Sequence, residues 1–394
     1  MKKLTYKHTM LACFTGYIVQ AIVNNFAPLL FVTFNTAYSI PLSRITALVT
    51  VNFAVQLCVD LLSALFVDKI GYRAGMVLAH ASSAAGLILL GILPRVMSNP
   101  FAGIIISVVI YAVGGGLLEV LVSPVMEGCP NDNKEKAMSL LHSFYCWGHV
   151  GVVLISTAFF RIFGIEQWWI LACIWALVPL CNLFVFLKTP IAPLLPEGEK
   201  GMHPSELFKN GTFWYLMLLM VCAGASEQAV SQWSSTFAEE GLHLTKAMGD
   251  LLGPTVFAVL MGLSRAVYGK YGDKLNLDRF MLGSGILCIS AYLLISLVPS
   301  PVTGVLGCAL TGLSVGIMWP GSFSKASKLL PLGGTAMFAL LALGGDLGCG
   351  GGPTLVGLIS GAAGDNLRVG ILCAVIFPLL PVVFMLLRSR KDAK

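Results

Sequence analysis

The chain has 394 residues, of which 57% are hydrophobic and 11% are charged, and its net charge at pH 7 is +6. Because an ordinary soluble domain carries roughly a quarter charged residues, this composition excludes a water-soluble globular protein. Apolar runs of about 20 residues recur along the chain, each long enough to cross a bilayer as a helix. They are continuous rather than alternating, which excludes a spanning β-barrel. The sequence therefore predicts an all-α membrane protein.

Charges, prolines and Gly/Asn clusters divide the chain into twelve predicted transmembrane helices. The first six lie near residues 8–35, 43–67, 73–94, 101–126, 135–161 and 167–187. The second six lie near residues 210–238, 246–270, 278–298, 302–329, 333–361 and 366–388. Between the two sets, residues 188–209 form the only long polar stretch, with four prolines and mixed charge. We predict an N-terminal bundle over 1–187, a cytoplasmic linker over 188–209 and a C-terminal bundle over 210–394.

The distribution of Lys and Arg predicts the orientation, because cytoplasmic loops carry an excess of both. With the N-terminus inside, the predicted outer loops carry only Arg44, Arg95, Arg161, Lys246 and Arg368. Both termini are therefore predicted to be cytoplasmic, in a multi-pass protein of the cell inner membrane. The positive net charge is explained by this bias and by nearby acidic lipid headgroups. It indicates a lipid bilayer as partner and no nucleic acid.

An internal repeat relates the two halves. Three features recur in the same order at an offset of 204 to 205 residues: FAV at 53–55 and 257–259, the Asp-Lys pairs at Asp68 and Asp273, and the prolines Pro94 and Pro299. Asp60 and Arg265 also correspond, since each lies eight residues before its loop aspartate. The pattern predicts two pseudo-symmetric six-helix bundles in parallel orientation. In such architectures the solute binds near the midplane between the two halves.

The loop between the second and third predicted helices contains DKIGYRAGM, residues 68–76. It resembles the Asp-Arg/Lys-x-Gly-Arg-Arg/Lys signature of the major facilitator superfamily, with Tyr72 in place of the first Arg of the basic pair. The resemblance implies the major facilitator fold and a secondary transporter rather than an enzyme.

A closer resemblance is to the fucose permease group of sugar:proton symporters. It is carried by VNNF (23–26), GGGLLEVLVSP (114–124), SLLHSFYCWG (139–148), IMWP (317–320) and GGDLGCGGGP (344–353). In that group a glutamate of the fourth helix lies by the sugar and takes part in proton coupling, which implies this role for Glu119. His142 stands where the group often has a glutamine facing the sugar. The first-helix aspartate of the fucose permease corresponds to Pro28, so its role is not carried over.

Ionisable residues inside membrane spans are costly and by default mark function. Four acids and one base lie in the predicted spans, namely Asp60, Glu119, Glu227, Arg265 and Asp346. This excess of acids is typical of a proton- or cation-coupled carrier of a neutral solute. We predict proton coupling by Glu119, with Glu227 as the second acidic candidate. Gating charges are predicted at Asp60, Asp68, Arg73, Arg265 and Asp273.

Polar side chains at helical spacing form stripes on the first, second and seventh predicted helices. Carboxamides and carboxylates pair with hydroxyl groups, and aromatic rings pack on the apolar face of a sugar. We predict solute binding by Gln20, Asn24, Asn25, Asn52, Gln56, Glu119, His142, Glu227, Gln228, Gln232, Trp233, Trp319 and Asp346. The alternative role for each amide is to hold helices together. The glycines of the fourth, tenth and eleventh helices are predicted to serve close helix packing.

The sequence has no phosphate-binding GxxxxGK[ST] loop, no HExxH and no nucleophile triad. Neither an enzyme nor a metal or organic cofactor is predicted, and the coupling ion is predicted to be H⁺. We therefore predict a monomeric secondary active transporter that takes up a sugar or similar small polyhydroxylated solute with protons. The alternative is a drug or amphipathic-solute exporter of the same fold, against which the density of amides argues. A receptor or scaffold is disfavoured by the internal symmetry.

Overall fold

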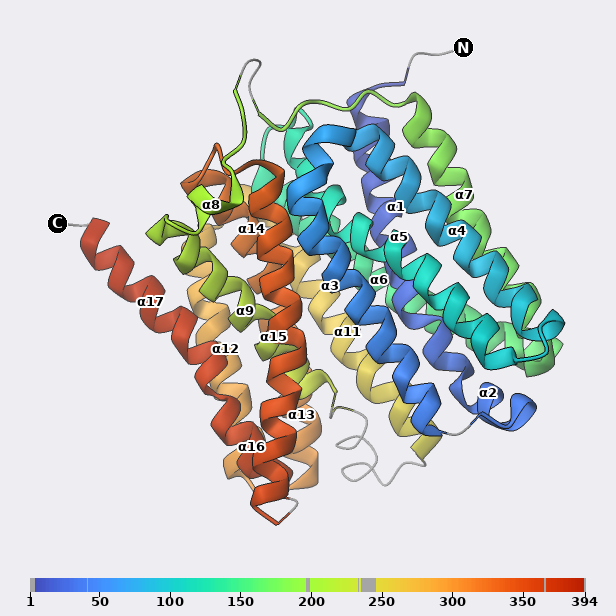
Figure 1. Ribbon diagram of the computed structural model, residues 1–394. Helices are drawn as coiled ribbons and strands as arrows, with labels where there is room; N and C mark the ends of the chain where they lie inside the picture. The colour runs from blue at the N-terminus through green and yellow to red at the C-terminus, as the bar shows by residue number, and fades with distance from the viewer. Residues whose placement is uncertain are drawn as a thin grey trace. The chain divides into compact units, whose positions relative to one another are not determined.

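The structure is a computed structural model that describes residues 4–40, 42–195, 199–232, 234, 246–364 and 366–392 (Figure 1). Within these ranges the chain forms helices joined by short connections and no strand. This confirms the predicted all-α class.

Six predicted spans of the N-terminal half correspond to observed helices within a few residues. In chain order the elements are α1 (Tyr6–Asn25), η1 (Ala27–Leu30), α2 (Phe31–Tyr38), α3 (Leu42–Ile70), α4 (Tyr72–Val96), α5 (Pro100–Gly128), α6 (Lys134–Phe163), η2 (Ile165–Gln167) and α7 (Trp168–Lys188). The first predicted span is therefore not one helix but three consecutive pieces.

The C-terminal half follows the same pattern after a mostly irregular linker. Its elements are α8 (Pro204–Leu207), α9 (Gly211–Ser231), α11 (Lys246–Tyr271), η3 (Gly272–Lys274), α12 (Leu277–Leu297), α13 (Pro301–Val315), α14 (Met318–Leu329), α15 (Gly334–Ala362), α16 (Leu367–Ala374) and α17 (Ile376–Asp392). The tenth and twelfth predicted spans are thus each divided into two helices.

Ten spans of the described chain are long and apolar enough to cross a membrane. The other two predicted spans correspond to α11 and α15, which are 26 and 29 residues long. These two helices carry the ionisable residues Arg265 and Asp346, respectively. The described helices are consistent with the predicted twelve.

Proline explains the two breaks that bear on the site. Proline has no N–H and its ring clashes with the carbonyl four residues earlier. Pro28 lies in η1, between α1 and α2, and Pro320 lies in the first turn of α14, just after the break that ends α13. Both residues are visible in the sequence, but the apolar run continues through them and predicts a single span.

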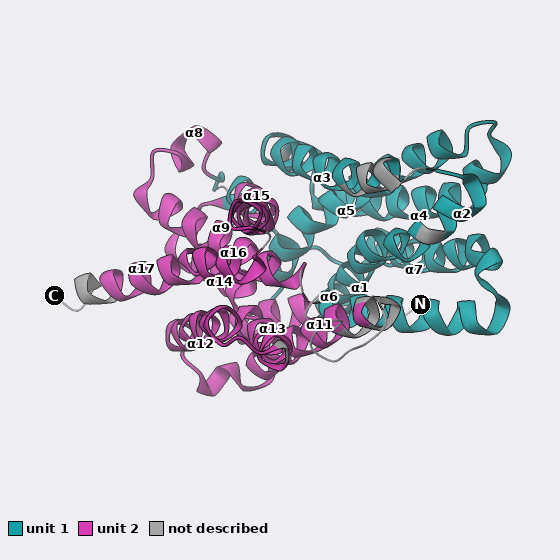
Figure 2. Ribbon diagram, turned by 90° about the horizontal axis from the view of Figure 1, so that it is seen from below, with its two compact units in different colours: residues 1–130, 144–201, 334–339 teal, residues 131–143, 202–333, 340–394 magenta. Residues whose placement is uncertain are grey.

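The chain forms two compact units (Figure 2). Unit 1 comprises residues 1–130, 144–201 and 334–339, and unit 2 comprises residues 131–143, 202–333 and 340–394. The units follow the predicted halves, except that the beginning of α6 groups with unit 2 and the beginning of α15 with unit 1. The bundle boundaries at 187 and 210 stay a prediction.

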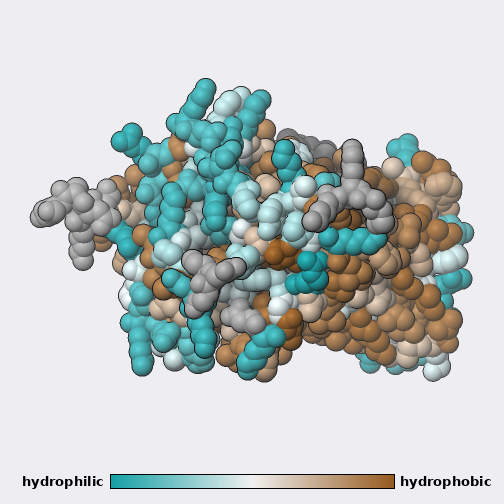
Figure 3. Space-filling model, turned by 90° about the horizontal axis from the view of Figure 1, so that it is seen from above, coloured by the Kyte–Doolittle hydropathy of each residue, from teal (hydrophilic) through white to brown (hydrophobic). Residues whose placement is uncertain are grey.

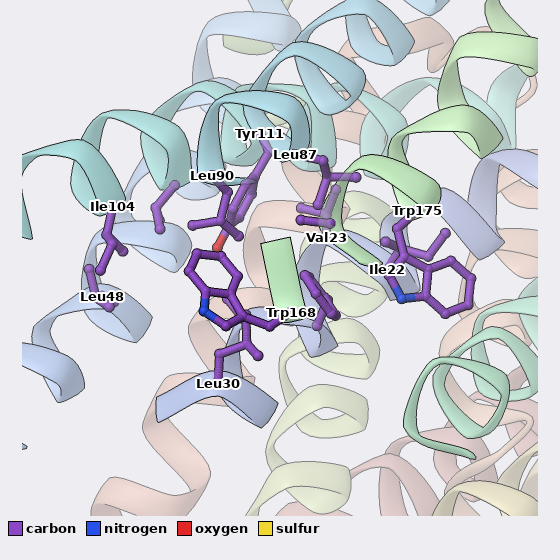
Figure 4. Close-up of a cluster of buried hydrophobic side chains, with 14 of the residues drawn as sticks. Ile22, Val23, Leu30, Leu48, Leu87, Leu90, Ile104, Tyr111, Trp168 and Trp175 are labelled. Atoms are coloured by element: carbon purple, nitrogen blue, oxygen red, sulfur yellow. The ribbon is translucent and has the colours of Figure 1, made fainter. Parts of the chain in front are cut away.

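An apolar cluster forms the core of unit 1 at one end of its helices (Figure 4). Ile22 of α1, Tyr111 of α5 and Trp168 of α7 are at most 4% exposed there. Trp168 packs edge to face on Phe34 with ring centroids 5.4 Å apart, an arrangement that stabilises aromatic pairs beyond their buried area. This cluster holds α1, α5 and α7 together next to the polar groups described below.

The membrane-facing surface reverses the usual amphipathic pattern. On α3 the polar stripe is buried and comprises Asn52, Gln56, Asp60 and Ser63, at 7%, 1%, 0% and 4% exposure. The rest of the α3 surface exposes large apolar residues, including Phe53, Leu61, Leu65 and Phe66. Figure 3 shows, on the face seen from above, hydrophilic side chains gathered over one part and hydrophobic residues over another. Polar-in and apolar-out packing places the functional groups inside each unit.

Glycines allow the helices to approach closely, as predicted. A Cβ added at Gly114 of α5 would lie 2.3 Å from Ser83 Oγ of α4. A Cβ added at Gly348 of α15 would lie 2.0 Å from the Val221 carbonyl oxygen of α9. Neither position has room for a side chain, so the prediction of glycine-mediated packing is confirmed at these two positions.

Candidate functional site

In unit 1 the predicted coupling residue Glu119 meets an amide of the first helix. Gln20 Nε2 of α1 donates a hydrogen bond to Glu119 Oε2 of α5 over 2.8 Å. The two helices pack tightly here, because a Cβ at Gly115 would lie 3.2 Å from Val23 of α1. The motif GGGLLE therefore supplies both the close packing and the carboxyl group.

One turn further along α1, Asn24 accepts from two amides of α3. Gln56 Nε2 donates to Asn24 Oδ1 over 2.8 Å, and Asn52 Nδ2 donates to the same oxygen over 3.2 Å. The neighbouring Asn25 instead donates to the Ala21 carbonyl oxygen within its own helix. The two asparagines of VNNF thus have different surroundings.

Burial divides this network into two layers. Gln20, Asn52 and Gln56 are 3%, 7% and 1% exposed, whereas Asn24 and Glu119 are partly exposed. Each buried amide donates to a partly exposed group: Gln20 to Glu119, and both Asn52 and Gln56 to Asn24. Three predicted solute-binding residues therefore support the two groups that are accessible.

In unit 2 the centre of the polar cluster is Arg265 of α11, which is 4% exposed. Its Nε donates to the Gly316 carbonyl oxygen over 2.7 Å and one terminal nitrogen donates to the His142 carbonyl oxygen over 3.1 Å. The other terminal nitrogen lies 3.5 Å from Glu227 Oε2 of α9. In return, Ser139 Oγ of α6 donates to the backbone oxygen of Arg265.

The Gly316 carbonyl is available because of Pro320. In an unbroken helix the N–H four residues later would donate to this oxygen, but proline has no N–H. The helix resumes with the hydrogen bond from Gly321 N to the Ile317 oxygen, 2.8 Å long. The motif IMWP therefore creates a backbone acceptor that the arginine of α11 occupies.

An aromatic row lies beside this arginine in unit 2. The Trp319 ring is edge-on to Phe323 at 6.4 Å, and Phe323 is tilted against His142 at 5.8 Å. A Cβ at Gly345 of α15 would lie 2.3 Å from Trp319 Cη2, so this glycine leaves the space that the indole fills. His142 is only 3% exposed, and its Nδ1 bonds the Met138 carbonyl oxygen of its own helix.

The remaining predicted binding residues are less closely placed. Gln228 Nε2 lies 3.4 Å from Glu227 Oε1, and Gln232 is exposed at the end of α9. Asp346 is partly exposed on α15. Trp233 lies outside the described residues.

Among the predicted gating residues, Arg73 binds the end of α7. Its guanidinium donates to the Phe186 and Thr189 carbonyl oxygens over 2.6 and 2.8 Å, which satisfies acceptors that every helix leaves open at its C-terminus. Asp60 is fully buried on α3. The side chain of Asp68 lies outside the described residues.

The fifth gating residue, Asp273 in η3, forms an ion pair with Lys136 of α6. Asn133 Nδ2 also donates to Asp273 Oδ1 over 2.8 Å. The hydrogen bonds from Lys136 and Asn133 hold the pKa of the Asp273 carboxyl below its ordinary value. The gating roles stay predictions.

Sequence reasoning missed a second group of charges near Asp273. Glu135 of α6 forms an ion pair with Lys328 of α14 and accepts a 2.7 Å hydrogen bond from the Tyr268 hydroxyl of α11. Lys325 likewise pairs with Asp278. Because these residues lie at helix ends, where charges are ordinary, no local signal distinguished them.

These arrangements match a known family. The family model described as Major Facilitator Superfamily matches residues 9–353. The chain belongs to the Major Facilitator Superfamily. Members of this superfamily are transporters, so the chain is a transporter and not an enzyme. Its ten candidate spans among the described residues make it a multi-pass membrane protein.

Individual relatives of this major facilitator are distant. The membrane protein MosC of Rhizobium meliloti is 21% identical over 349 residues, which cover 86% of this chain and 83% of MosC. The multi-drug resistance efflux pump PmrA of Streptococcus pneumoniae is 24% identical over 212 residues, about half of each chain, 52% in both cases.

Solved structures share the fold of this major facilitator over nearly its whole length. The fucose:proton symporter FucP of E. coli aligns with a TM-score of 0.81 at 16% identity, covering 97% of this chain and 99% of FucP. The proton:xylose symporter XylE aligns with a TM-score of 0.80 at 12% identity, covering 96% of this chain and 95% of XylE. These likenesses confirm the predicted fold.

Proposed function

We propose that this major facilitator takes up a sugar or a similar small polyhydroxylated solute together with protons, by alternating access. The observation that carries the proposal is the hydrogen bond of 2.8 Å between Gln20 and Glu119 inside a network of carboxamides. Carboxamides and carboxylates together offer donors and acceptors that match hydroxyl groups. The fold likeness to FucP and XylE, two sugar symporters by their names, supports the same solute class.

We further propose that Glu119 rather than Glu227 carries the coupled proton. One hydrogen-bond partner of Glu119 is the neutral amide of Gln20, which can serve a carboxylate as donor and a carboxylic acid as acceptor. Glu227 lies 3.5 Å from Arg265. Protonating Glu227 would remove a counter-charge from a buried guanidinium, and breaking a buried ion pair from one side is strongly destabilising.

Transport in proteoliposomes tests this assignment. A thermal-shift screen with monosaccharides, L-fucose and D-xylose among them, first identifies a transported probe, because a ligand that binds the folded state stabilises it. Glu119→Gln keeps the shape of the side chain but cannot ionise. We expect this variant to retain exchange of the probe and to lose accumulation driven by a pH gradient. Glu166→Gln, at an exposed position in η2, is the matched control and should accumulate the probe as wild type does.

Two outcomes would reassign the proton. If Glu119→Gln accumulates the probe against its gradient with wild-type pH dependence, Glu119 is not the coupling residue. If Glu227→Gln alone loses accumulation, Glu227, the partner of Arg265, carries the coupled proton.

The remaining predicted solute-binding residues are also proposed as solute ligands, and Trp319 is proposed to pack on the apolar face of the sugar. We also propose that the protein is a monomer in the cell inner membrane, with both termini and the 188–209 linker in the cytoplasm. The distribution of Lys and Arg along the chain supports this orientation.

The second candidate function is export of drugs or amphipathic solutes. The relationship to PmrA, an efflux pump by its name, favours it. The same thermal-shift screen distinguishes the two when lipophilic cations are added to the panel. Stabilisation by these cations and by no sugar would favour export.

A further inference from the structure

The two α3 amides that converge on Asn24 determine which end of its side chain faces outward. Gln56 and Asn52 both donate to Asn24 Oδ1. Among the described residues none accepts a hydrogen bond from Asn24 Nδ2. Because Gln56 and Asn52 are at most 7% exposed while Asn24 is partly exposed, the oxygen of Asn24 faces the interior and its NH₂ group faces the accessible side.

The reverse arrangement is physically less favourable. The oxygen and nitrogen of an amide are distinguished by their hydrogen bonds. If the Asn24 amide were turned, its nitrogen would face the two α3 amides, and Asn52 and Gln56 would have to turn as well to offer it an oxygen. Asn52 Oδ1 is buried and accepts no bond from a described residue. Turning Asn52 would place its NH₂ group, with two hydrogens, in that position. Orphaned buried N–H groups are rarer than under-satisfied carbonyl oxygens, so the observed orientation is preferred.

We propose that Asn52 and Gln56 are positioning residues that make Asn24 a hydrogen-bond donor toward the solute, one turn of α1 away from Gln20, whose amide holds the Glu119 carboxyl as acceptor. This inference rests on the proposed function and narrows its solute class. A donor and an acceptor one helical turn apart match a molecule with several hydroxyl groups, each of which can accept one bond and donate another. An ammonium group only donates and a carboxylate only accepts, so both match this pair less well. The preferred solute is therefore a neutral polyol.

A double-mutant cycle on the solute-free protein tests the orientation. Asn24→Asp replaces the outward NH₂ by a second oxygen and keeps an oxygen facing Asn52 and Gln56. Gln56→Met removes one inward donor at similar volume. A hydrogen bond to an ionised acceptor is roughly twice as strong as a neutral one, so Gln56→Met should lower the Tm about twofold more in the Asn24→Asp background than in wild type.

The neighbouring asparagine provides the matched control. Asn25 donates to a backbone carbonyl, so Asn25→Asp loses its bond, and Gln56→Met should lower the Tm equally with and without it. If Gln56→Met costs less in the Asn24→Asp background than in wild type, the amide faces the other way and the proposal is overturned. This result does not depend on any solute.

Binding of D-glucose and D-glucosamine tests the solute class. Wild type should prefer the neutral sugar, and Asn24→Asp should shift the ratio of the two Kd values at least tenfold toward the amine, because both groups of the pair then accept. An unchanged ratio would overturn the donor role of Asn24. If wild type binds neither these probes nor any other sugar, the proposed function fails, and the solute class inferred here fails with it. The melting cycle would still report the amide orientation.

Discussion

Replacing Arg265 by methionine should strongly destabilise unit 2. The variant keeps the apolar stem and removes the guanidinium, which donates to the Gly316 and His142 carbonyl oxygens and lies 3.5 Å from Glu227. Water cannot readily replace these contacts, because the Arg265 and Glu227 side chains are 5% and 14% exposed. The Gly316 carbonyl also has no helical donor, owing to Pro320.

The magnitude follows from these contacts. Removing one partner of a buried ion pair costs about 3 to 5 kcal/mol. An unsatisfied buried carbonyl at Gly316 adds about 1 to 3 kcal/mol, whereas the His142 carbonyl lies inside α6 and loses less. Glu227→Gln in the Arg265→Met background removes the uncompensated charge. The double variant should therefore recover most of the loss from the ion pair and retain only the smaller loss from the carbonyl.

The assay is the free energy of unfolding in detergent micelles, measured by denaturant titration for the two single variants, the double variant and wild type. Arg368→Met is the matched control, because that guanidinium donates to the Ile295, Val298 and Ser300 carbonyl oxygens and to no acid among the described residues. It should cost about 1 kcal/mol per lost hydrogen bond. If Arg265→Met costs no more than Arg368→Met, or if Glu227→Gln gives no recovery, the argument for a buried ion pair fails.

Two further predictions concern orientation and packing. In a cysteine-free background, an impermeant reagent should label a single cysteine at Asn99 from outside and one at Gly198 only after permeabilisation, since the Lys and Arg distribution predicts a cytoplasmic linker; the opposite result would reverse the topology. Gly345→Ala should lower stability by about 1 to 3 kcal/mol in thermal or denaturant unfolding, because a Cβ there would overlap the Trp319 ring. Gly350→Ala on the same helix meets nothing within 4 Å and should cost nothing; equal effects of the two variants would contradict the packing argument.

Helix positions were predictable because their causes are local. The predicted spans 73–94 and 278–298 correspond to α4 (Tyr72–Val96) and α12 (Leu277–Leu297). A bilayer requires about 20 apolar residues for each crossing, and charges, prolines and N-capping asparagines mark the ends. The break before Pro320 was equally local and could have been predicted from the missing N–H.

The site was predictable in residue type and only partly in arrangement. Glu119 was identified by its place in GGGLLE, but its contact with Gln20 joins residues 99 positions apart. Arg265 was predicted to be a gating charge, and the structure places it beside Glu227, 38 positions away. Periodicity gives the face of a helix on which a residue lies, but the neighbour of that face depends on helix rotation and packing.

The sequence by itself determined that this chain is an α-helical membrane transporter with two related halves, because composition, span length and repeated loop signatures each depend on neighbouring residues or on simple counts. Only the tertiary structure decided which polar groups are partners. Gln20, Asn52 and Gln56 look like solute ligands in the sequence, yet they are buried behind Asn24 and Glu119. The physical reason is that burial and hydrogen bonding arise from the approach of helices distant in sequence, which the glycines permit but do not specify.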